Sequence, residues 1–242
     1  MKSISELYTI RKKLAKKSPV WIVSFLLLAA FLGMMYSVAP AYVCSSYLLS
    51  SVFLYFLCIY ISMSLHGREN DVFEEVLLLH SRPDAAYYLS RELLQLCMCL
   101  IFAFVLSVFP ILKSIVQPHY FTRAITAADV IYGGAMILFC GICGIESGDL
   151  FHPRYINRKF GYCAVILLSV LAVCKHALIQ TSALFRILDI FLPPIMDSFI
   201  LLGNTDSFDG KGTVLILLHM LVYSSVITAI KIVLLKRWKY RM

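Results

Sequence analysis

The chain has 242 residues, of which 60% are hydrophobic and only 15% are charged, and its mean hydropathy is +0.83. Soluble domains carry roughly 25% charged residues, so this composition excludes an ordinary soluble domain and predicts an all-α protein that crosses a membrane several times. The net charge of +8 does not indicate a nucleic-acid partner, because the basic residues gather at the ends of apolar stretches, where cytoplasmic loops of membrane proteins hold them.

Residues 1–19 predict an amphipathic helix that lies on the anionic cytoplasmic leaflet and ends at Pro19. Its apolar stripe is Ile4, Leu7, Tyr8 and Leu14, and the basic residues expected at the membrane surface are Arg11, Lys12, Lys13, Lys16 and Lys17. A cleaved signal peptide ending at Ser37-Val38-Ala39 is the alternative. Pro40 disfavours cleavage there, so we expect the first span to be retained.

Residues 20–242 predict a single transmembrane domain of six helices. A span needs roughly 20 apolar residues to cross a hydrocarbon core of about 30 Å. The six stretches that meet this requirement are residues 20–38, 43–65, 93–116, 129–145, 160–179 and 214–235.

The distribution of lysine and arginine predicts that both termini are cytoplasmic. These residues are frequent in both terminal segments and in the connections after the second and fourth spans. The connections on the other side hold only Lys113, Arg123, Arg186 and Lys211. Such asymmetry sets orientation in polytopic proteins.

Charged residues near the cytoplasmic ends of the later spans have a simple interpretation. We expect Glu146, Asp149, Arg154 and Arg158 to form a solvated loop at the level of the headgroups, although its acidic residues are also candidates for contact with a partner. Lys231 is expected to extend its amine to the headgroups from within the last span.

Residues 66–92 form the longest charged interruption of the apolar sequence and predict a cytoplasmic loop with its own short helix. Asn70 or Asp71 can cap this helix, and Glu74 and Glu75 in its first turns complement the helix dipole. The Arg82-Pro83 pair ends it, because the residue before a proline is disfavoured in a helix. A new helix is expected from Tyr87 into the third span.

Residues 180–212 are too apolar for an ordinary external loop, and Pro193-Pro194 forbids a continuous helix. We predict an external re-entrant hairpin of two short helices. Irregular backbone at that depth is tolerated where it lines a cavity, so this element is expected to border a pathway. Candidate pathway residues are Lys175, His176, Pro193 and Pro194. For Lys175 the alternative is extension to the outer headgroups.

Motifs for catalysis on the chain itself are missing. The only Gly-Lys pair, Gly210-Lys211, lacks the rest of a phosphate-binding loop, and no zinc signature is present. The eight cysteines lie in or beside apolar stretches and predict small packing residues, not a metal site. We therefore expect no cofactor, no metal and no catalytic residue on this chain.

The segment 66–92 resembles the coupling helix of ATP-binding-cassette (ABC) type 2 permeases. The matching residues are Glu74, Glu75, Leu77, Leu78, Ser81, Arg82, Pro83, Tyr88, Leu89, Ser90 and Arg91. The family also has an interfacial amino-terminal helix and re-entrant external helices between its fifth and sixth spans. The glycine-threonine turn that often precedes the glutamates in relatives is replaced here by residues 70–73.

The resemblance implies an exporter subunit that pairs with a second copy or a homologue. A separate dimeric ATPase would bind ATP and Mg²⁺ and would contact Asp71, Val72, Phe73, Glu74, Glu75, Val76, Leu78, Leu79, Arg82 and Pro83. Small permeases of this kind resemble exporters of bacteriocins and phenol-soluble modulins in the plasma membrane of Gram-positive bacteria.

The nearly uncharged spans favour an amphipathic cargo, which we expect to be a peptide. Lipid, drug and glycan-linked cargo remain open. Two alternatives from other classes are an intramembrane hydrolase that uses Glu74, Glu75 or His80, and a non-transporting immunity or scaffold protein.

Overall fold

The structure is a computed structural model that describes residues 4–66, 84–153, 156–181, 192–202 and 206–237. These residues form eight helices and no extended strand. Five helices are long and apolar enough to cross a membrane, and the bent pair at the amino terminus brings the number to six if it is one span. The predicted all-α membrane architecture is confirmed at this level.

The amino-terminal pair consists of α1 (Ile4–Lys16) and α2 (Val20–Met35), which are bent by 66° at the break between them. Pro19 occupies the N-cap position of α2, and the two residues before it are not helical, so the chain changes direction where the sequence predicts it. Helix α2 has 16 residues, a length of about 24 Å at about 1.5 Å per residue. It is therefore the shortest of the six helices that correspond to the predicted spans.

Helices α3 (Val43–His66) and α6 (Ala127–Asp149) form the centre of the bundle. Glycines on α6 permit their close approach. A Cβ at Gly144 would collide with the carbonyl oxygen of Tyr55 and would lie 3.1 Å from Cβ of Cys58. A Cβ at Gly148 would lie 2.8 Å from Cβ of Ser62. The end of α6 is thereby held directly against the end of α3.

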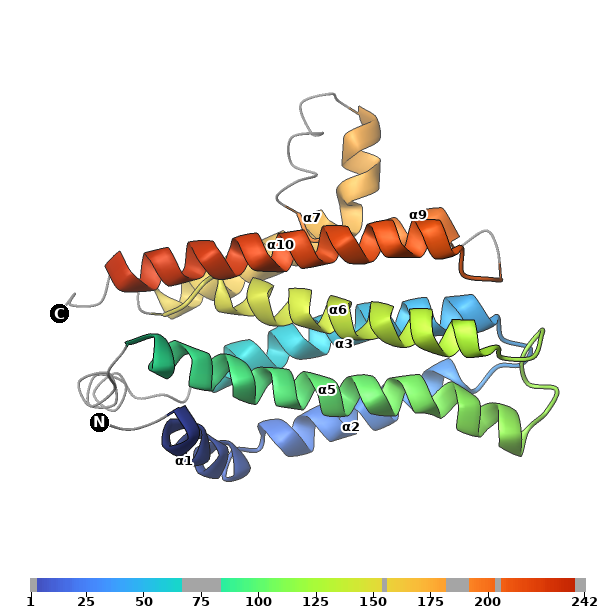
Figure 1. The fold of residues 1–242 in the computed structure, drawn as a ribbon, viewed down its shortest axis with the longest axis horizontal. Coiled ribbons are helices and arrows are strands. Elements are labelled where there is room, and N and C mark those ends of the chain that lie inside the picture. The colour runs from blue at the N-terminus through green and yellow to red at the C-terminus, as the bar shows by residue number, and fades with distance from the viewer. Residues whose placement is uncertain (1–3, 67–83, 154–155, 182–191, 203–205, 238–242) are drawn as a thin grey trace.

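Helices α5 (Asp84–Val116) and α10 (Gly210–Arg237) run alongside this centre, and α6 contacts both (Figure 1). The start of α5 and the ends of α3, α6 and α10 lie at the same end of the bundle, beside α1 (Figure 1). This end is the predicted cytoplasmic side. The 33 residues of α5 measure about 50 Å, so this helix is long enough to extend beyond a hydrocarbon core of about 30 Å.

Helix α7 (Arg158–Thr181) packs less closely than the others. Many of its apolar side chains are exposed, among them Phe160, Ile166 and Val170. The short α9 (Asp197–Leu202) lies against α10 and α3, and its residue Leu202 is buried. Of the predicted hairpin 180–212, residues 182–191 and 203–205 lie outside the described residues, and α9 corresponds to the second of its two expected helices.

Two predictions from the sequence need correction. Helix α6 continues through Glu146 to Asp149, so these two residues are helical and buried and do not form a solvated loop. Among the cysteines, five are buried as expected, but Cys163 and Cys174 are exposed on α7. Both corrections concern residues at the ends or on the outer faces of helices. Hydropathy alone does not show whether such a residue contacts protein or lipid.

The tight contact between α3 and α6 predicts that Gly144→Ala destabilises the protein. The added methyl group meets backbone, which cannot rotate away, and overpacking costs about 1–3 kcal/mol. Gly33→Ala is the matched control, since nothing lies within 4 Å of a Cβ at that position on α2. The midpoint of thermal unfolding in detergent should fall for Gly144→Ala only. Equal midpoints for both variants would contradict the packing described.

Candidate functional site

The residues predicted to contact an ATPase, 71–83, all lie outside the described residues. So do Glu74, Glu75 and His80, the candidate residues of the hydrolase alternative. The structure therefore leaves the coupling assignment as a prediction, but it does describe the helix that follows. That helix, α5, begins at Asp84, directly after the Arg82-Pro83 pair.

The basic residues of α1 and the turn after it divide into two groups. Lys12, Lys13, Lys16 and, just after the helix, Lys17 are exposed, as expected for a helix on a membrane surface. Arg11 differs, because it is only 4% exposed and its guanidinium lies 4.4 Å from the centre of the Tyr87 ring. Leu7, Tyr87, Tyr88 and Leu235 form an apolar cluster beside it. Helix α1 is thus packed against the start of α5 and the end of α10.

The pathway candidates lie together in part. Lys175 is buried, and its amine is 2.9 Å from the carboxylate of Asp197 on α9. Nδ1 of His219 on α10 lies 3.7 Å from the same carboxylate. Pro193 and Pro194 are buried just before α9, whereas His176 is exposed. Lys175 therefore has a protein partner and does not depend on the headgroups for its charge.

A larger buried polar cluster, which we call the lysine cluster, lies at the predicted cytoplasmic end of the bundle. Helix α5 contributes three of its members within one turn, α6 contributes two that are three residues apart, and the other members come from α3, α10 and the segment after α6. They are Ser62, Arg91, Glu92, Gln95, Glu146, Asp149, His152 and Lys231. Residues three or four apart share a helix face, which explains how α5 and α6 each present several polar groups.

Lys231 is at the centre of the lysine cluster and contacts three carboxylates. Its amine pairs with Oε1 of Glu92, lies 2.9 Å from Oε2 of Glu146 and lies 3.4 Å from Oδ2 of Asp149. The lysine is only 3% exposed. An amine at such depth is costly to bury unless it is paired, and these carboxylates connect α10 to both α5 and α6.

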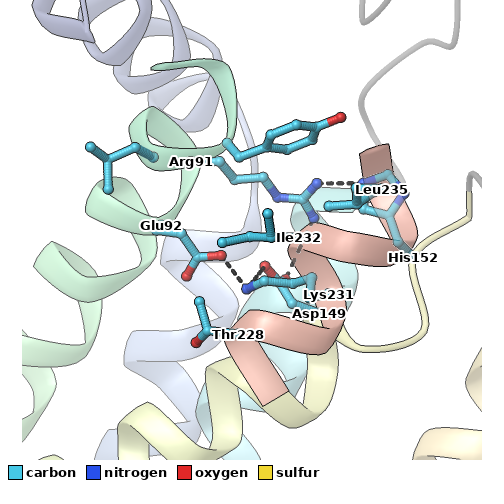
Figure 2. Close-up of a pocket in the computed structure, with 10 residues that line it drawn as sticks. Arg91, Glu92, Asp149, His152, Thr228, Lys231, Ile232 and Leu235 are labelled. Atoms are coloured by element: carbon cyan, nitrogen blue, oxygen red, sulfur yellow. Dashed lines mark hydrogen bonds and ion pairs between the residues drawn. The ribbon is translucent and has the colours of Figure 1, made fainter. Parts of the chain in front are cut away.

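Asp149 is the second centre. Its Oδ1 accepts hydrogen bonds from Ser62 and, at 2.9 Å, from Nε2 of Gln95, and it lies 3.5 Å from Nη2 of Arg91. The other terminal nitrogen of Arg91, Nη1, is 2.6 Å from Nε2 of His152 (Figure 2). A single carboxylate thereby joins α3, α5 and α6.

A cavity of about 330 Å³ lies against the lysine cluster. Its apolar wall includes Leu89, Ile232 and Leu235, and its charged side includes Glu92 and Lys231 (Figure 2). The volume is at the lower end of the range for small-molecule sites, roughly 300–1,000 Å³.

The sequence interpretation missed this cluster. Lys231 was expected to reach the headgroups, yet its amine is buried among carboxylates, and Glu146 and Asp149 were expected in a solvated loop. One signal was present: ionisable residues within an apolar span usually have a protein partner or a function. Lys231, with Arg91-Glu92 and the Glu146/Asp149 pair at the ends of other spans, fits that rule.

The opposite end of the bundle holds a second ion pair with a structural role. Arg123 donates two hydrogen bonds to Asp129, at 2.6 and 2.7 Å, and a third to the backbone oxygen of Asp206. The hydrogen bonds to Asp129 raise the pKa of Arg123 above its ordinary value. Thr126 and Asp129 form a capping box at the start of α6. This cluster fixes the connection between α5 and α6.

Among the described residues, no group of three or more histidine, cysteine or acidic side chains is arranged to hold a metal ion. Comparisons of the chain with protein-family models, curated proteins and solved structures found no match.

The lysine cluster predicts that Lys231→Met strongly destabilises the protein. The change would leave three buried carboxylates without their common cation, and breaking a buried ion pair costs about 3–5 kcal/mol. Lys211→Met, on an exposed lysine near the other end of α10, is the matched control. Thermal unfolding in detergent measures both. A midpoint for Lys231→Met within a degree of the control's would show that the amine is not paired as described.

Proposed function

We propose that this chain is the membrane subunit of an ABC exporter of the type 2 class, driven by a separate ATPase. In this proposal the chain crosses the plasma membrane of a Gram-positive bacterium six times, with both termini in the cytoplasm. It pairs with a second copy or a homologue, and it moves an amphipathic substrate, a peptide in the first instance, out of the cell.

The observation that carries the proposal is the position of the lysine cluster on α5. Arg91 and Glu92 follow Pro83, the last residue of the predicted coupling segment, by only eight and nine residues. They lie on the same continuous helix that begins at Asp84. A displacement of the coupling segment would therefore reach these side chains through rigid helix and not through a loop.

The partners of Arg91 and Glu92 give this displacement a route into the bundle. Arg91 pairs with Asp149 on α6, and Glu92 pairs with Lys231 on α10. One turn earlier on α5, Tyr87 contacts α1 through Arg11. The start of α5 thus holds three other helices through ion-pair and ring contacts, as expected of an element that transmits force between an ATPase and the spans.

The ATPase contact predicts that Glu75→Arg and Leu79→Asp abolish copurification with the ATPase. Leu79 would fill an apolar groove on that partner, and Glu75 would pair at its rim. The test is coexpression with the ATPase encoded beside this chain, followed by affinity purification and determination of the subunit ratio. Lys211→Glu is the charge-changing control, since Lys211 is exposed near the start of α10, on the predicted external side. Full retention of the ATPase by both coupling-segment variants would refute the assignment.

The transmission route predicts a different result for Asp149→Asn. This variant keeps the shape of the side chain but removes the charge that Arg91 and Lys231 share. The complex should form, while stimulation of ATP hydrolysis by the membrane subunit should fall about tenfold, within the usual range of coupling free energies, about 1–3 kcal/mol. Glu6→Gln, which removes an exposed carboxylate from α1, is the control. Unchanged stimulation in Asp149→Asn would exclude this route.

A further inference from the structure

The cavity beside the lysine cluster has the form of a site for an amphipathic molecule. One wall is apolar and is formed by Leu89 from α5 with Ile232 and Leu235 from α10. Glu92 and Lys231 also line the cavity, and their side chains point toward one another (Figure 2). A molecule that fills this cavity must therefore pack against apolar side chains and also interact with a charged group.

The pairing within the lysine cluster shows which charge is available to a ligand. Without Glu92, the amine of Lys231 would still have two carboxylate partners, Glu146 at 2.9 Å and Asp149 at 3.4 Å. Arg91 is paired with Asp149 at 3.5 Å. Among the described residues, Glu92 is the third carboxylate on a single lysine and has the most exposed side chain of the three, at 17% against 7% and 3%.

His152 does not supply the balancing positive charge through its contact with Arg91. A guanidinium has only N–H donors, so Nε2 of His152, 2.6 Å from Nη1 of Arg91, must be the acceptor. An imidazole that accepts at one nitrogen is neutral. Among the described residues, the charged and titratable groups around Glu92 are then Tyr88 and Arg91 on α5, Glu146 and Asp149 on α6, the neutral His152, and Lys231 on α10.

We propose that the cavity binds an amphipathic cation, with its positively charged head against Glu92 and its apolar part along Leu89, Ile232 and Leu235. The head replaces Lys231 as the partner of Glu92, and Lys231 remains neutralised by Glu146 and Asp149. An anion is disfavoured, because Lys231 and Arg91 already have carboxylate partners and the anion would approach Glu92 and Asp149.

The role of this site in transport rests on the proposed function. If the chain is an exporter subunit, the cavity is the site where cargo is taken up, and the cargo is positively charged. The location fits that role. Most of the residues that line the cavity come from the start of α5 and the end of α10. These helix ends lie at the predicted cytoplasmic end of the bundle (Figure 1). Glu92 also lies on the helix that follows the coupling segment, so binding would be sensed at the element that the ATPase moves.

The test measures binding of three ten-carbon probes that differ only in the head group: decylamine, which is cationic at pH 7, decanol and decanoate. The purified chain is placed in phosphatidylcholine nanodiscs without any ATPase, and binding of radiolabelled decylamine is measured with the other two as competitors. Decylamine should bind saturably, and decanol and decanoate should compete at least tenfold more weakly than unlabelled decylamine. Lower pH should weaken binding, since a proton on Glu92 removes the charge that attracts the head.

Two variants locate the site. Glu92→Gln should weaken decylamine binding at least tenfold while the protein keeps its unfolding midpoint within a few degrees. Glu6→Gln, which removes an exposed carboxylate from α1 at the same end of the protein, should bind as the unmodified chain does. Unchanged binding in Glu92→Gln, or equal binding of decanol, would overturn the proposal. Proton uptake by Glu92 without any saturable decylamine binding would overturn it as well.

The source of the cationic head is distinguished by competition. Displacement of decylamine by a cationic amphipathic peptide supports a peptide amine as the natural occupant. Loss of decylamine binding in nanodiscs that contain phosphatidylethanolamine supports a lipid amine. Because binding is measured without the ATPase, failure to bind in a chain that still forms the ATPase complex contradicts this site alone. Binding by a chain that forms no such complex contradicts the proposed exporter function alone.

Discussion

The ion pairs of Lys231 are the interaction on which the arrangement of the bundle depends. One amine on α10 is held by carboxylates from α5 and α6, and Asp149 extends the contacts to Ser62 on α3. Burying these charges is costly, and hydrophobic residues of similar size often stabilise a protein equally well. A buried cluster of this kind instead determines which helices pack together and how far each is shifted along its axis relative to its neighbours. Any other alignment would leave a buried charge without its partner.

The close packing of α3 and α6 makes this cluster geometrically possible. Gly144 and Gly148 bring the backbone of α6 against α3, and Ser62 thereby reaches Asp149. The same end of the bundle receives α1, whose Arg11 covers the ring of Tyr87. The first turns of α5 are therefore held in place by both apolar packing and ion pairs. The proposed function places the moving element at this point, where a small displacement changes contacts with several helices.

Hydropathy predicted most of the fold, because helices in lipid must satisfy their own backbone and be apolar over a fixed length. The second span, residues 43–65, coincides with the observed helix to within one residue, and the break at Pro19 is confirmed. The lysine cluster could not be predicted in the same way. A buried Lys231 and one that extends to the headgroups have the same sequence pattern, and only the positions of Glu92, Glu146 and Asp149 on neighbouring helices distinguish them.

The proposed exporter function requires a separate ATPase as the partner of this chain. Native mass spectrometry of the chain, purified from its own membrane in a mild detergent, tests this requirement directly. The expected result is a complex of two membrane subunits, both this chain or one a homologue, with two copies of a nucleotide-binding protein, and ATP should remain bound to the latter. A chain that is recovered alone, or only with proteins that bind no nucleotide, would contradict the exporter function.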